Sequence, residues 1–120
     1  MAKILIIEDD LDFSELLKVN LSKEGWEIIT ADEGYKAVDL VVNSTPDLIL
    51  LDLNLPYLDG DVVISLFNEK KITDQIPVII MSGEEESRLQ AAKEKIGAKL
   101  YIKKPLDIEK LKIAIKDTLA

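Results

Sequence analysis

Five runs of apolar residues alternate with segments in which apolar residues recur every three or four positions. Runs rich in β-branched and aliphatic residues are typical of strands buried in a parallel sheet, whereas the three-to-four spacing predicts amphipathic helices. Because strands and helices alternate five times, the pattern predicts an α/β fold with helices on both faces of the sheet. The apolar runs span residues 2–7, 26–29, 48–51 (followed directly by Asp52), 77–81 and 98–102.

Five helices are predicted between and after these strands, and polar residues mark several of their ends. Asp10 or Asp12 can cap the first helix, and Asp107 can cap the last. Thr30 and Glu33 have the spacing of a capping box ahead of the second helix. The predicted helices occupy about residues 11–24, 31–44, 59 onward, 84–96 and 107–119.

The connectivity predicts where the strands lie relative to one another. Right-handed crossovers place successive strands predictably, and because the strands are parallel, all their carboxyl ends fall on one edge of the sheet. Five strands suit the order 2-1-3-4-5 of doubly wound, flavodoxin-like folds, in which the first and third strands are neighbours. Glu8 and Asp9 follow the first strand and Asp52 ends the third. We therefore expect these three carboxylates to converge.

Composition narrows the classes of function. The chain has 120 residues, which predicts a single domain spanning 1–120. It has no cysteine, no signal-peptide pattern and no apolar run near the ~20 residues that span a bilayer, so we expect a cytoplasmic protein that does not associate with membranes. A net charge of −8 argues against direct nucleic-acid binding. Without histidine, the chain cannot form a phosphohistidine itself.

Converging carboxylates either raise one another's pKa or bind a cation. Oxygen ligands without histidine or cysteine favour Mg²⁺. Helix capping within a solvated turn would also explain Glu8, Asp9 and Asp10. Asp52 favours the cation site, because capping does not explain two strands that both end in carboxylates. A flavodoxin-type phosphate loop is disfavoured, since it would need glycines and hydroxyls after the first strand.

Three further residues lie at or near the same edge of the predicted sheet. Ser82 ends the fourth strand, although Ser82 and Glu85 also fit a capping box. Lys104 follows the fifth strand; most lysines are solvated, but one aimed at carboxylates would serve as a counter-charge or phosphate ligand. Tyr101 would by default be a core residue. With Asp52 as nucleophile, this combination suits phosphoryl transfer onto the protein.

Five short motifs occur in the chain in a characteristic order and spacing. They are Ile6-Ile7-Glu8-Asp9, Leu51-Asp52, Leu55-Pro56 with Asp59-Gly60, Met81-Ser82-Gly83, and Tyr101 with Lys104-Pro105. Each motif is weak alone, and five in order are specific. With these motifs the chain resembles the receiver domain of bacterial response regulators, the CheY-like superfamily of two-component signalling, over essentially its full length.

The resemblance implies roles for the acidic residues. Asp52 would be the phosphoacceptor. Asp9 would bind Mg²⁺ directly and Glu8 through water, with Asp52 as a further ligand and Asn54 contributing its backbone carbonyl. Glu8 stands where aspartate is frequent in the family, which lengthens one arm of the acid pair.

The resemblance also implies a conformational switch that responds to phosphorylation. Ser82, where threonine is more common, and Lys104 would contact the phosphoryl oxygens, and Tyr101 would turn inward on activation. The output surface would be the face formed by the helix at 84–96, the strand at 98–102 and the last helix. The Lys104-Pro105 bond is often cis in the family, against a general prior of about 5–6% for X-Pro bonds.

The expected function is that of a phosphoprotein in a two-component or phosphorelay system. A sensor histidine kinase or phosphotransfer protein would donate the phosphoryl group, and the first helix would dock it. A separate effector protein, or an output domain absent from this sequence, would read the signal. The chain would not be an enzyme in the usual sense, since it would catalyse only phosphotransfer to its own aspartate and slow dephosphorylation.

Two alternatives belong to other classes. A Mg²⁺-dependent aspartyl phosphohydrolase resembling haloacid dehalogenases would carry Asp-x-Asp on its first strand and a cap segment. Here the candidate nucleophile, Asp52, is on the third strand and no cap is evident. A receiver-like interaction module without phosphate cycling is the second alternative, and the intact set of Asp52, Ser82 and Lys104 argues against it.

Overall fold

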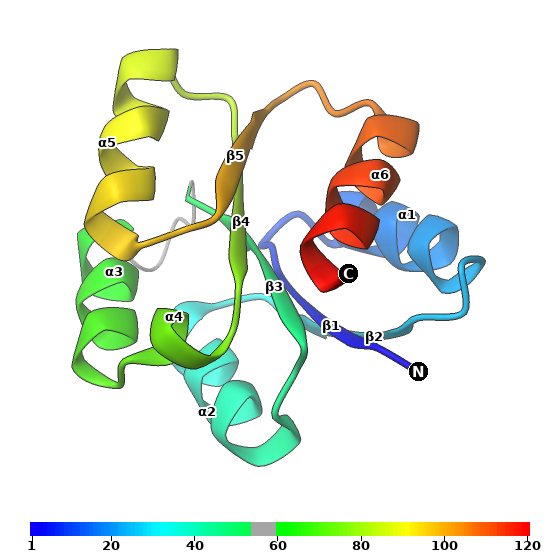
Figure 1. The fold of residues 1–120 in the computed structure, drawn as a ribbon, viewed down its shortest axis with the longest axis horizontal. Coiled ribbons are helices and arrows are strands. Elements are labelled where there is room, and N and C mark those ends of the chain that lie inside the picture. The colour runs from blue at the N-terminus through cyan, green and yellow to red at the C-terminus, as the bar shows by residue number, and fades with distance from the viewer. Residues whose placement is uncertain (54–59) are drawn as a thin grey trace.

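A five-stranded parallel sheet forms the centre of the molecule (Figure 1). The structure is a computed structural model that describes residues 1–53 and 60–120, with side chains of 60–64 excluded. The strand order is β2-β1-β3-β4-β5, which confirms the order 2-1-3-4-5 expected from the sequence. The strands are β1 (Lys3–Ile7), β2 (Glu27–Ala31), β3 (Leu48–Asp52), β4 (Val78–Ser82) and β5 (Leu100–Lys103).

Helices cover both faces of this sheet, as the α/β prediction requires. Helices α1 and α6 pack on one face, and α2, α3 and α5 pack on the other (Figure 1). Among the described residues, no helix is long and apolar enough to cross a membrane. The helices are α1 (Leu11–Ser22), α2 (Gly34–Ser44), α3 (Gly60–Glu69), α4 (Ile72–Gln75), α5 (Glu86–Ile96) and α6 (Ile108–Leu119).

The prediction of five helices missed α4. This helix is a single turn of four residues between α3 and β4. A segment this short cannot display the periodicity of an amphipathic helix, so the apolar pattern gave no signal for it.

The continuous apolar runs are explained by burial on both faces of the sheet. Successive side chains of a strand point to opposite faces. In β1, Ile4 and Ile6 join the apolar layer beneath α1 and α6, whereas Leu5 and Ile7 join the layer beneath α2, α3 and α5. All five residues of β3 are buried, including Asp52 at its carboxyl end. The run of apolar residues therefore positions a carboxylate at the edge of the core.

Side-chain caps start two of the helices as expected, and a third cap was predicted wrongly. Asp10 accepts a hydrogen bond from the backbone N–H of Phe13 at 3.1 Å. Asp107 accepts two from the first turn of α6, at 3.0 and 3.3 Å. Thr30, however, lies inside β2, and Glu33 stands at the start of α2 without a side-chain capping bond. Pairing with β1 extends β2 through Ala31, which leaves no room for the predicted capping box.

The cap of α6 gives a test of this local structure. Asp107→Ala removes both capping bonds, and we expect the free energy of unfolding to fall by about 1 kcal/mol in urea titrations. Asp117→Ala, at an exposed position in the last turn of the same helix, serves as the control. It should not destabilise, because a negative charge is unfavourable at a helix carboxyl end. Equal losses in both variants would contradict the capping role.

Candidate functional site

Three carboxylates meet at the carboxyl edge of the sheet, where β1 and β3 lie side by side. Glu8 follows β1, Asp9 is next in the chain, and Asp52 is the last residue of β3. One carboxylate oxygen from each of the three lies within 4.8 Å of the others. Glu8 and Asp52 are each only 2% exposed. The structure thus brings together the acidic residues that the strand order predicted would converge.

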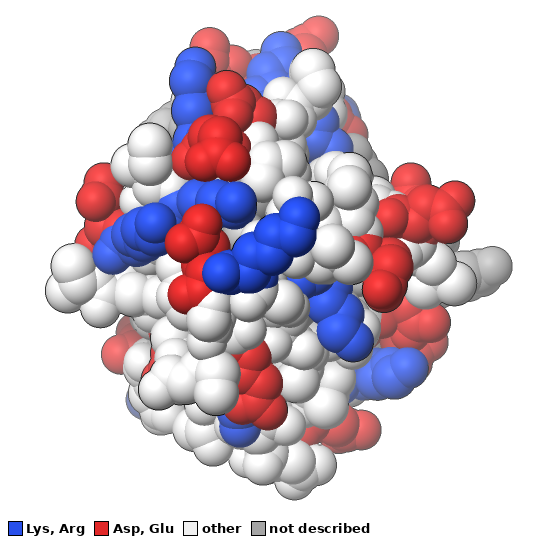
Figure 2. Space-filling view, turned by 90° about the vertical axis from the view of Figure 1, so that its right-hand side faces the viewer, with Lys and Arg blue, Asp and Glu red and all other residues white. Residues whose placement is uncertain are grey.

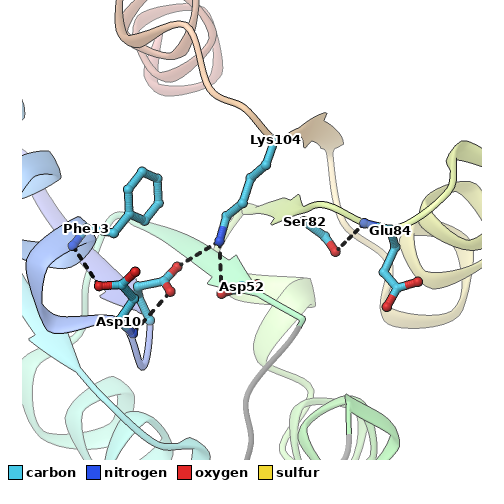
Figure 3. Close-up of polar contacts among 7 residues, drawn as sticks. Asp10, Phe13, Asp52, Ser82, Glu84 and Lys104 are labelled. Carbon is cyan, nitrogen blue, oxygen red and sulfur yellow. Dashed lines mark hydrogen bonds and ion pairs between the residues drawn. The ribbon is translucent and has the colours of Figure 1, made fainter.

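Lys104 lies against two of these carboxylates (Figure 3). Its Nζ is 3.1 Å from Oδ2 of Asp52 and 3.4 Å from Oε2 of Glu8. The backbone N–H of Lys104 donates to the carbonyl of Ser82 at 2.8 Å, which ties the residue to the end of β4. The peptide bond from Lys104 to Pro105 is cis, as the resemblance implied.

The crowding of charge shifts two pKa values. Burial, a hydrogen bond with Asp52 and the negative charge of Asp52 together raise the pKa of Glu8 to about 7, against the lowering effect of Lys104 and of the backbone N–H of Asp10. Burial by itself would lower the pKa of Lys104, but the charges of Asp52 and Glu8 outweigh it and raise that pKa above its ordinary value. Lys104 is therefore a cation at neutral pH, and one cation does not balance the acid cluster.

The raised pKa of Glu8 predicts how the metal-free protein responds to pH. The folded state binds this proton more tightly than the unfolded state, so the free energy of unfolding decreases as the pH rises from about 4.5 through 7. We expect Glu8 to account for about 1–3 kcal/mol of that decrease.

Urea titrations in EDTA at several pH values between 5 and 8 measure the effect. Glu8→Gln is the matched control, because glutamine keeps the shape and cannot ionise. Its stability should change less with pH than that of the parent, and it should be the more stable protein at pH 8. Parallel pH profiles for the two proteins would contradict the raised pKa.

Ser82 is fully buried at the end of β4, on the opposite side of Lys104 from α1 (Figure 3). Its Oγ accepts a hydrogen bond from the backbone N–H of Glu84 at 3.1 Å. The interpretation of Ser82 and Glu85 as a capping box is wrong, because α5 begins only at Glu86 with Glu85 at the N-cap position. Ser82 closes a turn instead, and its hydroxyl lies at the same edge as the carboxylates.

Tyr101 is half-buried in β5 and packs against the apolar layer beneath α2, α3 and α5. Its hydroxyl donates a hydrogen bond to Oε1 of Glu86, at the start of α5, at 3.1 Å. Burial raises the pKa of this phenol, and the bond to Glu86 and its charge raise it further. The ring is thus a core residue in part, as its default interpretation predicted, while its polar end reaches a surface helix.

Two residues of the site stand apart from the sequence predictions. Asn54, expected to provide a backbone ligand, lies outside the described residues, as do Leu55-Pro56 and Asp59 of the loop motif. Phe13 was not among the predicted site residues, yet its ring centroid lies 4.8 Å from Nζ of Lys104. No sequence pattern signals this contact, because the two residues belong to distant segments.

The chemistry available at this edge follows from the groups present. Buried carboxylate oxygens provide hard ligands suited to Mg²⁺, which binds few protein carboxylates and keeps several waters. Beside them lie an ammonium group and a hydroxyl group. A nucleophilic carboxylate with cations placed to neutralise charge is the arrangement that phosphoryl transfer requires.

Comparisons with known proteins agree with this geometry. The family model described as the response regulator receiver domain matches residues 4–116. Sporulation initiation phosphotransferase F of Bacillus subtilis (strain 168) is 36% identical over 118 residues, covering 98% of this chain and 93% of that protein. The DNA-binding dual master transcriptional regulator RpaA of Synechocystis is 36% identical over 121 residues, covering 99% of this chain and 49% of that protein. The chain therefore spans about half the length of that second relative.

Solved structures give the same result. The receiver domain of the Francisella response regulator 1452 superposes with a TM-score of 0.89 at 26% identity, covering 99% of this chain and 97% of that one. The signal receiver domain of a response regulator from Bermanella marisrubri gives a TM-score of 0.88 at 30% identity, covering 98% of both chains.

Proposed function

Because this chain belongs to the response regulator receiver domain family, we propose that it accepts a phosphoryl group on Asp52 and thereby changes a surface that a partner protein reads. The contact between Lys104 Nζ and Asp52 Oδ2, at 3.1 Å beside Glu8, is the observation that carries this proposal. It places a cation next to a buried carboxylate, at the point where a phosphoryl group would add charge.

Mg²⁺ fits the acidic cluster as the cofactor. Asp9 would bind it directly, Glu8 through water, and Asp52 through a carboxylate oxygen, with the backbone carbonyl of Asn54 as a further ligand. When bound, the ion would supply positive charge to the phosphoryl oxygens. The charge imbalance among Glu8, Asp52 and Lys104 supports such a site, because a divalent cation would allow all the carboxylates to ionise together.

The chain's own residues would carry the transfer. A carboxylate oxygen of Asp52 attacks phosphorus, and the bond from phosphorus to the donor breaks as the new O–P bond forms. Lys104 binds a phosphoryl oxygen through its ammonium group, and Ser82 donates a hydrogen bond to another. The phosphoryl group comes from a phosphohistidine of a histidine kinase or phosphotransfer protein, since this chain contains no histidine.

Phosphorylation would be read at the face formed by α5, β5 and α6. Ser82 moves toward the phosphoryl group, and Tyr101 leaves Glu86 and turns inward. A hollow of about 560 Å³ between β5 and α6 supports an output site here, since it is bordered by Ile113, an apolar residue that is 59% exposed. The same hollow is flanked by Lys99 and Lys110.

The donor would dock on α1, next to the site. This helix exposes the apolar side chains of Leu11, Leu16 and Val19. Figure 2 shows the side of the molecule that carries α1 and α6, where acidic and basic side chains are interspersed rather than forming a continuous basic surface. That surface and the net charge of −8 support protein partners rather than nucleic acid.

Phosphodonor labelling tests the proposal. We expect a phosphoryl adduct, seen by intact mass, when the protein is incubated with acetyl phosphate and Mg²⁺, and none when EDTA replaces Mg²⁺. The adduct should also disappear slowly after the donor is removed, because we expect the protein to hydrolyse its own aspartyl phosphate slowly. A folded protein that binds Mg²⁺ but gains no mass would overturn the proposal.

A further inference from the structure

A chain of contacts joins the start of α1 to Lys104. The backbone N–H of Asp10 donates to Oε1 of Glu8 at 3.3 Å, and the carboxylate of Asp10 accepts from the N–H of Phe13 at 3.1 Å. Lys104 then returns to Glu8 through an ion pair at 3.4 Å. The ring of Phe13 lies 4.8 Å from Nζ of Lys104 and completes this set of contacts (Figure 3).

The Phe13 ring has the position and environment to act on the lysine. Phe13 is half-buried and packs against the apolar layer beneath α1 and α6, which holds the ring in place. The side chain of Lys104 is 27% exposed, so its ammonium group is partly removed from water. An aromatic face attracts such a cation through its quadrupole, and the attraction grows with desolvation.

A lysine side chain is difficult to hold in one position unless a neighbouring group contacts it. Its four-carbon stem has many rotamers, and its ammonium group has no fixed fork to align it. In Figure 3 the ring stands on the α1 side of Lys104 and Ser82 stands on the other side. The lysine thus contacts Asp52 from a position between the ring and Ser82.

We propose that Phe13 is a positioning residue for phosphoryl transfer, whose ring holds the ammonium group of Lys104 beside Asp52. The inference rests on the proposed function, because it concerns the rate of the same reaction. It assigns to Phe13 a role that leucine, which fills a similar apolar space, cannot perform.

Labelling rates with acetyl phosphate at saturating Mg²⁺ test this role. Phe13→Leu should slow labelling about three- to tenfold, whereas Phe13→Tyr, which keeps an aromatic face, should label within about twofold of the parent. Trp26→Leu is the control, because it removes an aromatic side chain from the same apolar layer at the opposite edge of the sheet. It should leave the labelling rate unchanged.

A double-mutant cycle shows whether Phe13 acts through Lys104. In a Lys104→Met background, Phe13→Leu should cause no further slowing, because there is no cation left to position. The same cycle in urea titrations with EDTA should give midpoint shifts that are not additive, and this readout does not require any labelling.

The outcomes separate the two proposals. Equal slowing by Phe13→Leu in both backgrounds, or a failure of Phe13→Tyr to restore the rate, would reduce Phe13 to a packing residue while the labelled parent upheld the proposed function. Additive urea midpoints would show that the ring and the ammonium group do not interact, and would overturn the inference. A folded parent without label would overturn the proposed function, and the positioning role with it.

Discussion

Asp52→Asn is expected to abolish labelling by acetyl phosphate, lowering the rate by at least about a thousandfold. An amide cannot replace the carboxylate as nucleophile, and we propose Glu8 and Asp9 as Mg²⁺ ligands rather than as acceptors. The substitution keeps the volume of a residue that is 2% exposed, so the core should remain packed. In EDTA the variant should be at least as stable as the parent, because it removes one negative charge from a crowded cluster.

Intact mass after incubation with donor and Mg²⁺ measures this loss. Asp74→Asn, which changes an exposed carboxylate in α4, is the matched control and should label like the parent. Circular dichroism of both variants confirms that they fold. An adduct that forms on Asp52→Asn at the parental rate would place the acceptor on another residue.

Lys104→Met is expected to have the largest effect on stability of the substitutions at the site. Methionine keeps most of the stem and removes the cation that contacts Asp52 and Glu8. Removing one partner of a buried ion pair leaves uncompensated charge, which typically costs 3–5 kcal/mol. Because the lysine side chain is 27% exposed, we expect a loss of about 2–4 kcal/mol in EDTA at pH 8.

Two conditions should reduce this loss. Mg²⁺ supplies positive charge to the same carboxylates, so its addition should stabilise Lys104→Met more than the parent. Lowering the pH to about 5.5 should also narrow the difference, because Glu8, with a pKa of about 7, becomes protonated. Urea titrations under the three conditions measure both effects.

The neighbouring lysine provides the control for this experiment. Lys103→Met changes an exposed residue at the end of β5 and should alter stability by less than about 0.5 kcal/mol. If Lys104→Met were as stable as the parent in EDTA at pH 8, another group would have to balance the buried carboxylates. The expectation that Lys104 is the counter-charge would then be wrong.

The parts of the fold that could be predicted depend on local pattern and general topology. The central strands β1, β3 and β4 were recognisable because they are buried on both faces and are therefore nearly unbroken apolar runs. The edge strands β2 and β5 are only partly buried. The order 2-1-3-4-5 followed from the number of strands and the order common in doubly wound folds, together with crossover handedness, rather than from any particular residue. The convergence of Glu8, Asp9 and Asp52 followed from that order, and the structure confirms it.

The parts that could not be predicted depend on side-chain direction between distant segments. Nothing in the sequence indicates that Phe13 faces Lys104, or that the hydroxyl of Tyr101 reaches Glu86. The wrong capping box at Thr30 has a related cause, since the end of β2 is decided by its pairing with β1. Local spacing alone cannot distinguish a strand end from a helix start in such cases.

The sheet also divides the apolar interior into two separate layers, and this division has a mechanical consequence. Tyr101 belongs to the layer beneath α2, α3 and α5, whereas Phe13 belongs to the layer beneath α1 and α6. A repacking around Tyr101 would act first on the layer beneath α2, α3 and α5, because the strands of the sheet lie between the two layers. Of the two helices in the proposed output face, α5 packs in the layer away from α1, whereas α6 packs in the same layer as α1. The proposed donor and output surfaces are therefore linked through α6 as well as through the edge that carries Asp52.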